Sequence, residues 1–150
     1  MTTANGKIDD ANSRTKSYDY LVKAMNARNS GAPEAAATAL AEISTDGFST
    51  DAQAIFDALC SELETPLQAA YKKAGLDAFE NKDYATAITK LEAARSLSEE
   101  ADYDILNYLA HAYRLSGEKE KANAIFQMII DTFPETTKAE DARKYLTKDT

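Results

Sequence analysis

The chain has 150 residues, enough for one domain of ordinary size, and carries 17 basic against 25 acidic side chains for a net charge of −8. This charge repels phosphate backbones and anionic lipid head groups, so nucleic-acid and membrane binding are disfavoured outside any local basic patch. Cys60 is the only cysteine, which excludes an intramolecular disulfide, and the apolar positions of its helix predict a buried rather than a reactive thiol.

Residues 1–16 carry one large apolar side chain besides the initiator, Ile8, and this composition predicts a flexible leader that adds little to a core. No apolar run follows a basic start, so the segment lacks the pattern of a signal peptide. No stretch of the sequence approaches a transmembrane span. Two compartments stay open: cytoplasmic, or extracytoplasmic if the chain is a fragment that lacks its anchor or signal.

Residues 17–150 are predicted to form one helical domain. An N-terminal helix covers 17–30 and ends where Gly31 interrupts the apolar stripe. Pro33 suits the first turn of a second helix, whose many alanines favour helix formation.

A third helix is expected over 50–63, and Thr65 is expected to cap a fourth helix that begins with Pro66. The pairing of the first three helices has two solutions. If 33–65 is a degenerate repeat unit, the second and third helices pair, and the next unit begins in register at Gln68. In the alternative, the first and second helices pair and the third is an odd linker. The sequence favours the first solution.

The pattern over 103–134 predicts a helical hairpin with its own stop signal. Two amphipathic segments flank Gly117, and Pro134 ends the second because proline has no backbone N–H. The predicted buried positions recur at the i, i+3, i+4, i+7 spacing of one helix face: Leu106, Leu109, Ala110 and Tyr113 in the first helix, and Ala122, Ile125, Phe126 and Ile129 in the second.

The hairpin pattern occurs twice, over 68–101 and over 103–136. Gly75 lies in the middle of a predicted helix, where glycine costs about 1 kcal/mol relative to alanine. Packing is sufficient reason for it. A short polar helix over 137–147 is predicted to cap the C-terminal end.

These two units resemble the tetratricopeptide repeat, a helix–turn–helix of about 34 residues with small residues at its helix crossings and a proline near its end. Asp83 and Tyr84 followed by Ala87 match the usual start of its second helix. Glu99 departs from the pattern, because it stands where the family often has proline, and an extra residue lengthens that loop. Residues 133–146 are also similar to tetratricopeptide proteins of bacterial cell envelopes. The resemblance implies an all-α, right-handed α-solenoid of antiparallel helix hairpins, with about eight helices.

The sequence offers little for catalysis. His111 is the only histidine and lies far from Cys60 in the sequence, so a zinc site is not expected. The acidic residues of 99–102 are predicted to solvate a loop rather than to act as general acid and base. No glycine-rich phosphate loop is present. We therefore expect a protein that is not an enzyme and that has no cofactor and no metal.

The first helix of each unit lines a concave groove in the resembled family. The resemblance therefore implies a basic and aromatic peptide-binding groove formed by Lys72, Lys73, Leu76, Phe79, Asn107, Tyr108, His111 and Arg114. Some members clamp a terminal carboxylate, but Leu76 and Tyr108 stand here where asparagine would be needed. In the alternative interpretation, Phe79 and Tyr108 are partly buried against the neighbouring helix and the lysines only solvate.

The leading functional hypothesis is a non-catalytic protein-binding or peptide-binding module that acts as a scaffold or adaptor. Its partner would be held by apolar and aromatic contacts, with Lys72, Lys73 and Arg114 selecting acidic residues. His111 would make binding sensitive to pH near 6 to 7, or would be a plain polar surface residue. The alternatives are a self-association domain, which would make the chain a homo-oligomer, and an accessory domain of a larger membrane-anchored protein.

Overall fold

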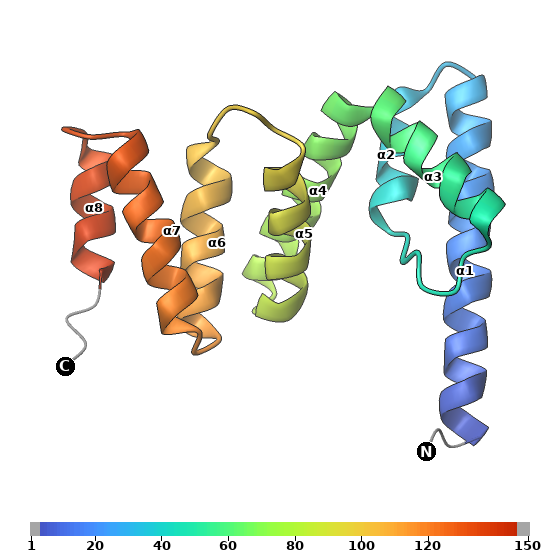
Figure 1. The fold of residues 1–150 in the computed structure, drawn as a ribbon, viewed down its shortest axis with the longest axis horizontal. Coiled ribbons are helices and arrows are strands. Elements are labelled where there is room, and N and C mark those ends of the chain that lie inside the picture. The colour runs from blue at the N-terminus through green and yellow to red at the C-terminus, as the bar shows by residue number, and fades with distance from the viewer. Residues whose placement is uncertain (1–3, 147–150) are drawn as a thin grey trace. The chain divides into compact units, whose positions relative to one another are not determined.

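The computed structural model describes residues 4–146, with side chains from residue 14 onward. Residues 1–3 of the predicted leader and Thr147 of the predicted capping helix lie outside this range. Within it the regular structure is entirely α-helical (Figure 1), which confirms the predicted all-α fold of about eight helices. The helices are α1 (Ala4–Asn29), α2 (Pro33–Ala41), α3 (Thr50–Glu62), α4 (Glu64–Glu80), α5 (Tyr84–Ser96), α6 (Tyr103–Leu115), α7 (Lys119–Thr132) and α8 (Thr137–Tyr145).

The helices fall into two compact units, unit 1 over residues 1–70 and unit 2 over residues 71–150. The division lies within α4, so unit 1 holds α1 to α3 and the first turns of α4, and unit 2 holds the rest. All residues of the predicted binding groove belong to unit 2.

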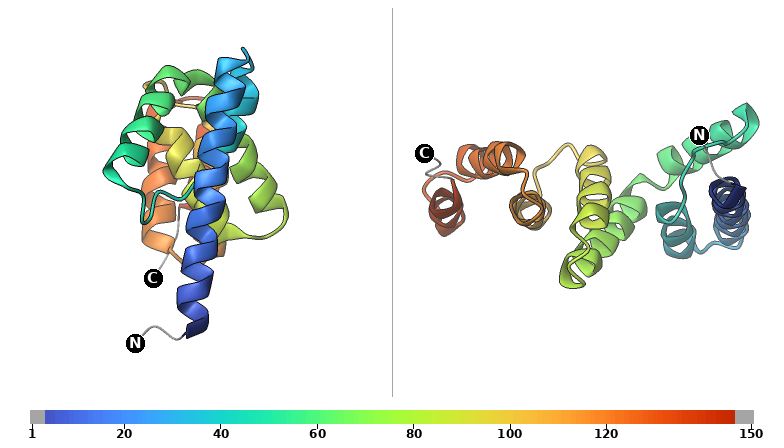
Figure 2. Two further views of the ribbon diagram at one scale, coloured as in Figure 1. Left: turned by 90° about the vertical axis from the view of Figure 1, so that its right-hand side faces the viewer. Right: turned by 90° about the horizontal axis from the view of Figure 1, so that it is seen from below.

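Unit 1 is built on a hairpin of α1 and α2, which lie side by side in both orientations of Figure 2. Gly31 turns the chain with a φ of 78°, and Pro33 opens α2. Of α3, only Ala52 and Leu59 are fully buried. The observed pairing is therefore that of the alternative prediction, in which the first and second helices pair. It is not that of the favoured prediction, a repeat unit over 33–65 in which the second and third helices pair. The small side chains of α2 explain it, because they let α1 approach closely; the buried residues of this hairpin are Leu21, Ala24, Ala36, Ala37, Ala39, Leu40 and Ala41.

The first helix begins at Ala4, thirteen positions before the Ser17 expected from the sequence. The side chains at its middle contact the loop after α2: the Ser17 hydroxyl accepts a hydrogen bond from the Ser44 N–H at 3.2 Å. Arg14 also lies against Gly47, where an added Cβ would come within 2.5 Å of the arginine Cδ. The predicted boundary at residue 16 rests on the lack of apolar side chains before it. Such a composition limits burial, but it does not prevent a helix that contains no proline.

No loop separates α3 from α4. Leu63 ends α3, and its carbonyl accepts the N–H of Leu67 at 2.8 Å, so the helical path continues into α4. Because α4 begins at Glu64, the prediction of Thr65 as its N-cap is wrong. Pro66 lies in the first turn of α4, where its missing N–H leaves no intrahelical bond unmade.

In unit 2, α5, α6, α7 and α8 follow one another as packed antiparallel helices (Figure 1). Asp83, Asp102 and Thr136 cap α5, α6 and α8 by accepting a backbone N–H with their side chains. Gly117 turns the chain between α6 and α7 with a φ of 90°. All eight predicted buried positions of the 103–134 hairpin are buried, which confirms that prediction; the core also includes Leu91, Ala94, Ile105, Ala112 and Ala142.

Gly75 marks a close crossing of α4 and α5. A Cβ added to it would lie 2.6 Å from Cγ and 2.7 Å from Cδ2 of Leu91, whose side chain is fully buried. Neither atom can move away without disturbing the core, because interiors are packed to the density of organic crystals. This explains why a glycine stands in the middle of α4.

We therefore expect Gly75→Ala to destabilise unit 2 by about 1–3 kcal/mol through overpacking, even though alanine favours the helix by about 1 kcal/mol. Urea unfolding followed by circular dichroism measures the change. Gly31→Ala, at a turn glycine with a φ of 78° and nothing near its Cβ position, shows the cost of backbone strain without overpacking. An unchanged or higher midpoint for Gly75→Ala would contradict the crossing.

Candidate functional site

The predicted groove residues come from two helices of unit 2, the second half of α4 and all of α6. Within each set the residues are spaced mainly three or four positions apart, so they lie on one side of their helix. Contacts between side chains of the two helices bring the sets together. We call this surface the α4–α6 face; it consists of Lys72, Lys73, Leu76 and Phe79 on α4, and Asn107, Tyr108, His111 and Arg114 on α6.

Two aromatic rings join the helices at the middle of the α4–α6 face. Phe79 and Tyr108 meet edge to face, with 5.1 Å between ring centroids and 89° between planes. Tyr84 of α5 also meets Phe79 edge to face, with 5.5 Å between ring centroids. All three are half-buried and pack against the core of unit 2. Phe79 and Tyr108 are therefore partly buried against neighbouring helices, as the alternative interpretation predicts, and the rings still keep an exposed portion.

Lys72 is engaged by two aspartates of the same unit. Its Nζ lies 2.9 Å from Oδ2 of Asp102 and 3.6 Å from Oδ2 of Asp104. The hydrogen bond to Asp102 raises the pKa of Lys72, which stays protonated. An acidic partner would have to compete with these carboxylates, so Lys72 serves first to tie α4 to the start of α6.

Asp102 was predicted only to solvate its loop, and the structure corrects this. Its carboxylate caps α6 by accepting the Ile105 N–H at 3.2 Å, besides pairing with Lys72. Burial acts to raise the pKa of Asp102, but the hydrogen bonds from Lys72 and Ile105 outweigh it, and the pKa is lower than usual. An aspartate directly before an amphipathic helix was the signal available in the sequence.

We expect Asp102→Ala to cost about 1–2 kcal/mol of unfolding free energy at neutral pH, through the lost cap and the lost ion pair. Asp102→Asn should cost less, because asparagine also caps helices. Since the folded-state pKa of Asp102 lies below its usual 3.8, its contribution is full above that value and is lost as the pH falls through the folded-state pKa. Acid titrations of stability should therefore be less steep for Asp102→Asn than for the original chain; equal slopes would contradict this assignment.

Two polar side chains of the α4–α6 face are open to a partner. The side chain of Lys73 is 82% exposed, and its nearest carboxylate, of Asp77, lies 3.9 Å away. Asn107 is half-buried, and no hydrogen bond from residues 14–146 engages its amide. An amide has two donors and two acceptor sites, so Asn107 can bond both the N–H and the C=O of an extended peptide.

The end of the α4–α6 face is covered by α8. The ring of Tyr145 packs edge to face on His111 at 4.5 Å, and the guanidinium of Arg114 lies 4.9 Å from the centre of the Tyr145 ring. Arg114 also donates from Nε to Nδ1 of His111 at 3.3 Å. The sequence predicted the capping helix over 137–147, but this role of Tyr145 was missed. Arg114 and His111 thus hold α8 in place.

The contacts of His111 in this cluster determine which of its ring nitrogens carries the proton. Because arginine only donates, Nδ1 of His111 must be an unprotonated acceptor, and the ring proton lies on Nε2. Burial, and secondly the charge of Arg114, lower the pKa of His111 from its usual 6.5. The imidazole is therefore neutral at pH 7.

We expect the NMR titration of His111 to have a midpoint below 6.5. Arg114→Ala should raise that midpoint, whereas Arg143→Ala, at an exposed arginine of α8, should not. Since the unfolded state binds a proton more tightly, stability should fall as the pH drops below 6.5 towards the folded-state pKa. A midpoint at or above 6.5 in the original chain would contradict the packing of His111 under Tyr145.

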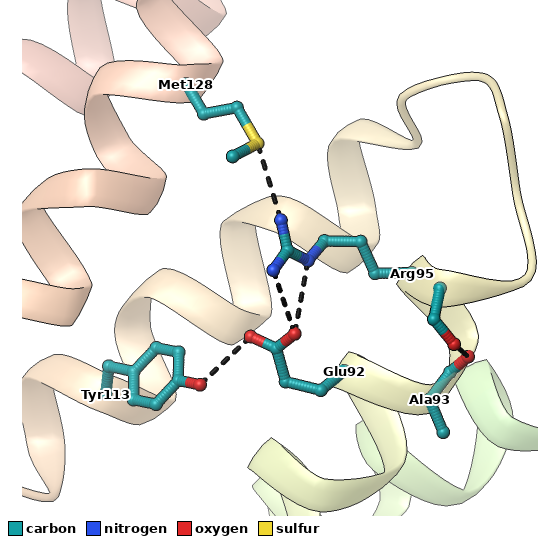
Figure 3. Close-up of polar contacts among 6 residues, drawn as sticks. Glu92, Ala93, Arg95, Tyr113 and Met128 are labelled. Atoms are coloured by element: carbon teal, nitrogen blue, oxygen red, sulfur yellow. Dashed lines mark hydrogen bonds and ion pairs between the residues drawn. The ribbon is translucent and has the colours of Figure 1, made fainter.

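A second concave feature lies where the chain passes from α5 to α6. It is a pocket of about 340 Å³ between the end of α5, the loop over 97–102, the start of α6 and one residue of α7. Arg95 lines this pocket, and Figure 3 shows its guanidinium between the carboxylate of Glu92 and the sulfur of Met128. Glu92 also accepts the Tyr113 hydroxyl at 2.9 Å. The i, i+3 spacing of Glu92 and Arg95 is the sequence signal for their ion pair, although neither residue was among the predicted site residues.

The chemistry of the remaining groups is limited. Burial, and secondly Asp57, raise the pKa of the Cys60 thiol to about 11, so the thiol is protonated at neutral pH and is a poor nucleophile. In the part of the chain that the structure describes, no three metal-binding side chains lie close enough to hold an ion. None of its described helices is both long enough and apolar enough to cross a bilayer.

The packed antiparallel helices of unit 2 define a helical-repeat fold. The comparison with family models identifies the repeat. Residues 78–146 match the tetratricopeptide repeat model, and this segment, from the last turn of α4 to the end of α8, belongs to that family. Neither a curated protein nor a solved structure matched the sequence. Repeats of this family generally mediate protein–protein interaction and scaffolding.

Proposed function

We propose that the chain is a non-catalytic scaffold or adaptor that holds an extended segment of a partner protein on the α4–α6 face. One observation carries the proposal: the half-buried Phe79–Tyr108 pair keeps an exposed portion, and the residue before Tyr108, Asn107, has a side-chain amide that no hydrogen bond of the described chain engages. Rigid aromatic rings supply contact area at low entropic cost, and aromatic residues are enriched among those that dominate binding energies.

Each part of the face has its own role in this proposal. The rings of Phe79 and Tyr108 pack against apolar side chains of the partner. Asn107 bonds its backbone, and Lys73 attracts acidic side chains. Lys72 and Arg114 are occupied by Asp102 and by the α8 cluster, so we assign them to holding the helices and not to selecting the partner. The terminal-carboxylate clamp of some family members is not part of the proposal.

Selection from a random peptide library tests this function without requiring that the partner be identified first. The full chain serves as bait, and Tyr108→Ala serves in a parallel selection. We expect the full chain to enrich peptides with apolar and acidic residues that Tyr108→Ala does not enrich. If the same peptides are enriched equally on both baits, or if neither bait enriches any peptide, the result would count against the α4–α6 face as the binding site.

A pair of amide substitutions sharpens the test. Asn107→Ala should weaken an enriched peptide by about tenfold, the value of one or two hydrogen bonds. Asn81→Ala removes an exposed amide from the turn between α4 and α5 and should leave the affinity unchanged. Equal effects of the two variants would argue that Asn107 does not touch the peptide.

A further inference from the structure

The pocket between α5 and α6 is a separate concavity with its own chemistry. Its loop over 97–102 is the one that an extra residue lengthens, and Glu99 occupies the place of the family's usual proline. Ile105 and Leu106 of α6 are buried and form the apolar part of the lining. Met128 of α7 adds a flexible, polarisable side chain. Ile105 and Leu106 are only 1% and 2% exposed, so the half-buried Met128 provides the surface on which a chain of methylene groups can pack.

The pocket has a net negative charge after the ion pairs among its lining residues and their neighbours are counted. Arg95 is neutralised by Glu92, at 2.9 Å, and Asp102 by Lys72, also at 2.9 Å. Glu99 and Glu100 also line the pocket and are exposed. Neither forms an ion pair with a cation in the described range of 14–146. Two uncompensated carboxylates therefore lie at its edge.

The helix termini around the pocket favour the same sign of charge. The last carbonyls of α5 give this end of the helix a partial negative charge. The start of α6 carries the opposite partial charge, but the Asp102 carboxylate already caps it. The field within the pocket is therefore suited to a cation, and the apolar lining suits the stem that carries it.

We propose that this pocket receives a single lysine or arginine side chain of a protein partner. The methylene stem packs on Met128, while the cationic head reaches Glu99 and Glu100. This inference goes beyond the α4–α6 face, because the pocket is formed by the α5–α6 loop and α7. The pocket would select a cationic side chain, whereas Lys73 of the α4–α6 face would attract acidic ones. A volume of about 340 Å³ is within the range of small-ligand sites, about 300–1,000 Å³.

Three blocked peptides probe the pocket: acetyl-Gly-Arg-Gly-amide, its lysine analogue, and its citrulline analogue, which has nearly the shape of arginine without the charge. Isotope-labelled full chain is titrated with each and followed by NMR. We expect the arginine or the lysine peptide to cause saturable shifts at the amides of 97–102 and at the Met128 methyl group. The citrulline peptide should bind about fivefold more weakly, the value of about 1 kcal/mol for an exposed charge pair.

Two variants locate the interaction. Glu99→Gln with Glu100→Gln keeps the loop backbone and should weaken the arginine peptide to the level of the citrulline peptide. Tyr108→Ala, on the α4–α6 face, should leave the pocket shifts intact, so failure of the pocket and failure of the proposed function can be told apart. Equal binding of arginine and citrulline peptides, shifts elsewhere on the chain, or no saturable shift with any peptide would overturn the proposal.

Discussion

Replacing Phe126 by alanine should lower the free energy of unfolding by about 3–5 kcal/mol, the usual cost of truncating a fully buried phenylalanine. Phe126 is among the largest fully buried side chains of the described chain. Its ring stacks on Tyr145 of α8 at 5.5 Å and contacts His111 of α6 at 5.2 Å. A single substitution in α7 therefore removes contacts to the helices on both sides.

Urea unfolding, followed by circular dichroism, measures this change. Leu115→Ala is the matched control, since Leu115 is a large apolar residue of the same unit that is 44% exposed, and its loss should change stability by no more than about 0.5 kcal/mol. If both variants unfold at the same midpoint, Phe126 does not lie at the centre of unit 2, and the stacking of α6, α7 and α8 is wrong.

Tyr108→Ala should weaken a peptide enriched on the α4–α6 face by about thirtyfold or more, which corresponds to the loss of about 2 kcal/mol expected at a dominant interface aromatic. The loss has two sources: the partner loses the Tyr108 ring, and Phe79 loses the neighbour that fixes its own ring at 5.1 Å. Isothermal titration calorimetry on the full chain measures the affinity.

Tyr108→Phe is the matched control for this prediction, because it keeps both ring contacts and removes only the hydroxyl. It should retain affinity within about threefold if the ring dominates, as aromatic packing usually outweighs one exposed hydrogen bond. An affinity for Tyr108→Ala close to that of the original chain would remove the aromatic pair from the proposed interface.

The repeat hairpin over 103–134 was predictable because several independent signals agree there. Apolar residues recur at helical spacing, Gly117 supplies the turn, and Pro134 follows the last helical residues. Gly75 was predictable for a different reason. The resemblance to the tetratricopeptide repeat implies a close helix crossing at this position, and Leu91 provides it.

The N-terminal part was less predictable because α2 is rich in alanine. Alanine favours the helix at nearly every position but marks no distinct buried face, so the pairing of α1 with α2 could not be chosen from periodicity. The start of α1 at Ala4 was missed for a different reason, because Ile8 is the only large apolar residue among residues 4–16. Its residues can form a helix without the apolar stripe by which helices are recognised.

Within the candidate site, the sequence placed residues on the correct helices but did not predict what pairs with them. Lys72 and Arg114 were assigned to a partner because a helical pattern cannot show that Asp102 or Tyr145 reaches them from other parts of the chain. Such contacts depend on side chains separated by about 30 residues, which local periodicity does not encode.

The most direct test of the central proposal is an NMR titration of the isotope-labelled full chain with a peptide enriched by the library selection. We predict that the side-chain amide signals of Asn107 and the ring signals of Phe79 and Tyr108 shift together and saturate with one affinity. Saturable shifts confined to unit 1 or to the α5–α6 loop, with these three residues unmoved, would contradict a partner site on the α4–α6 face.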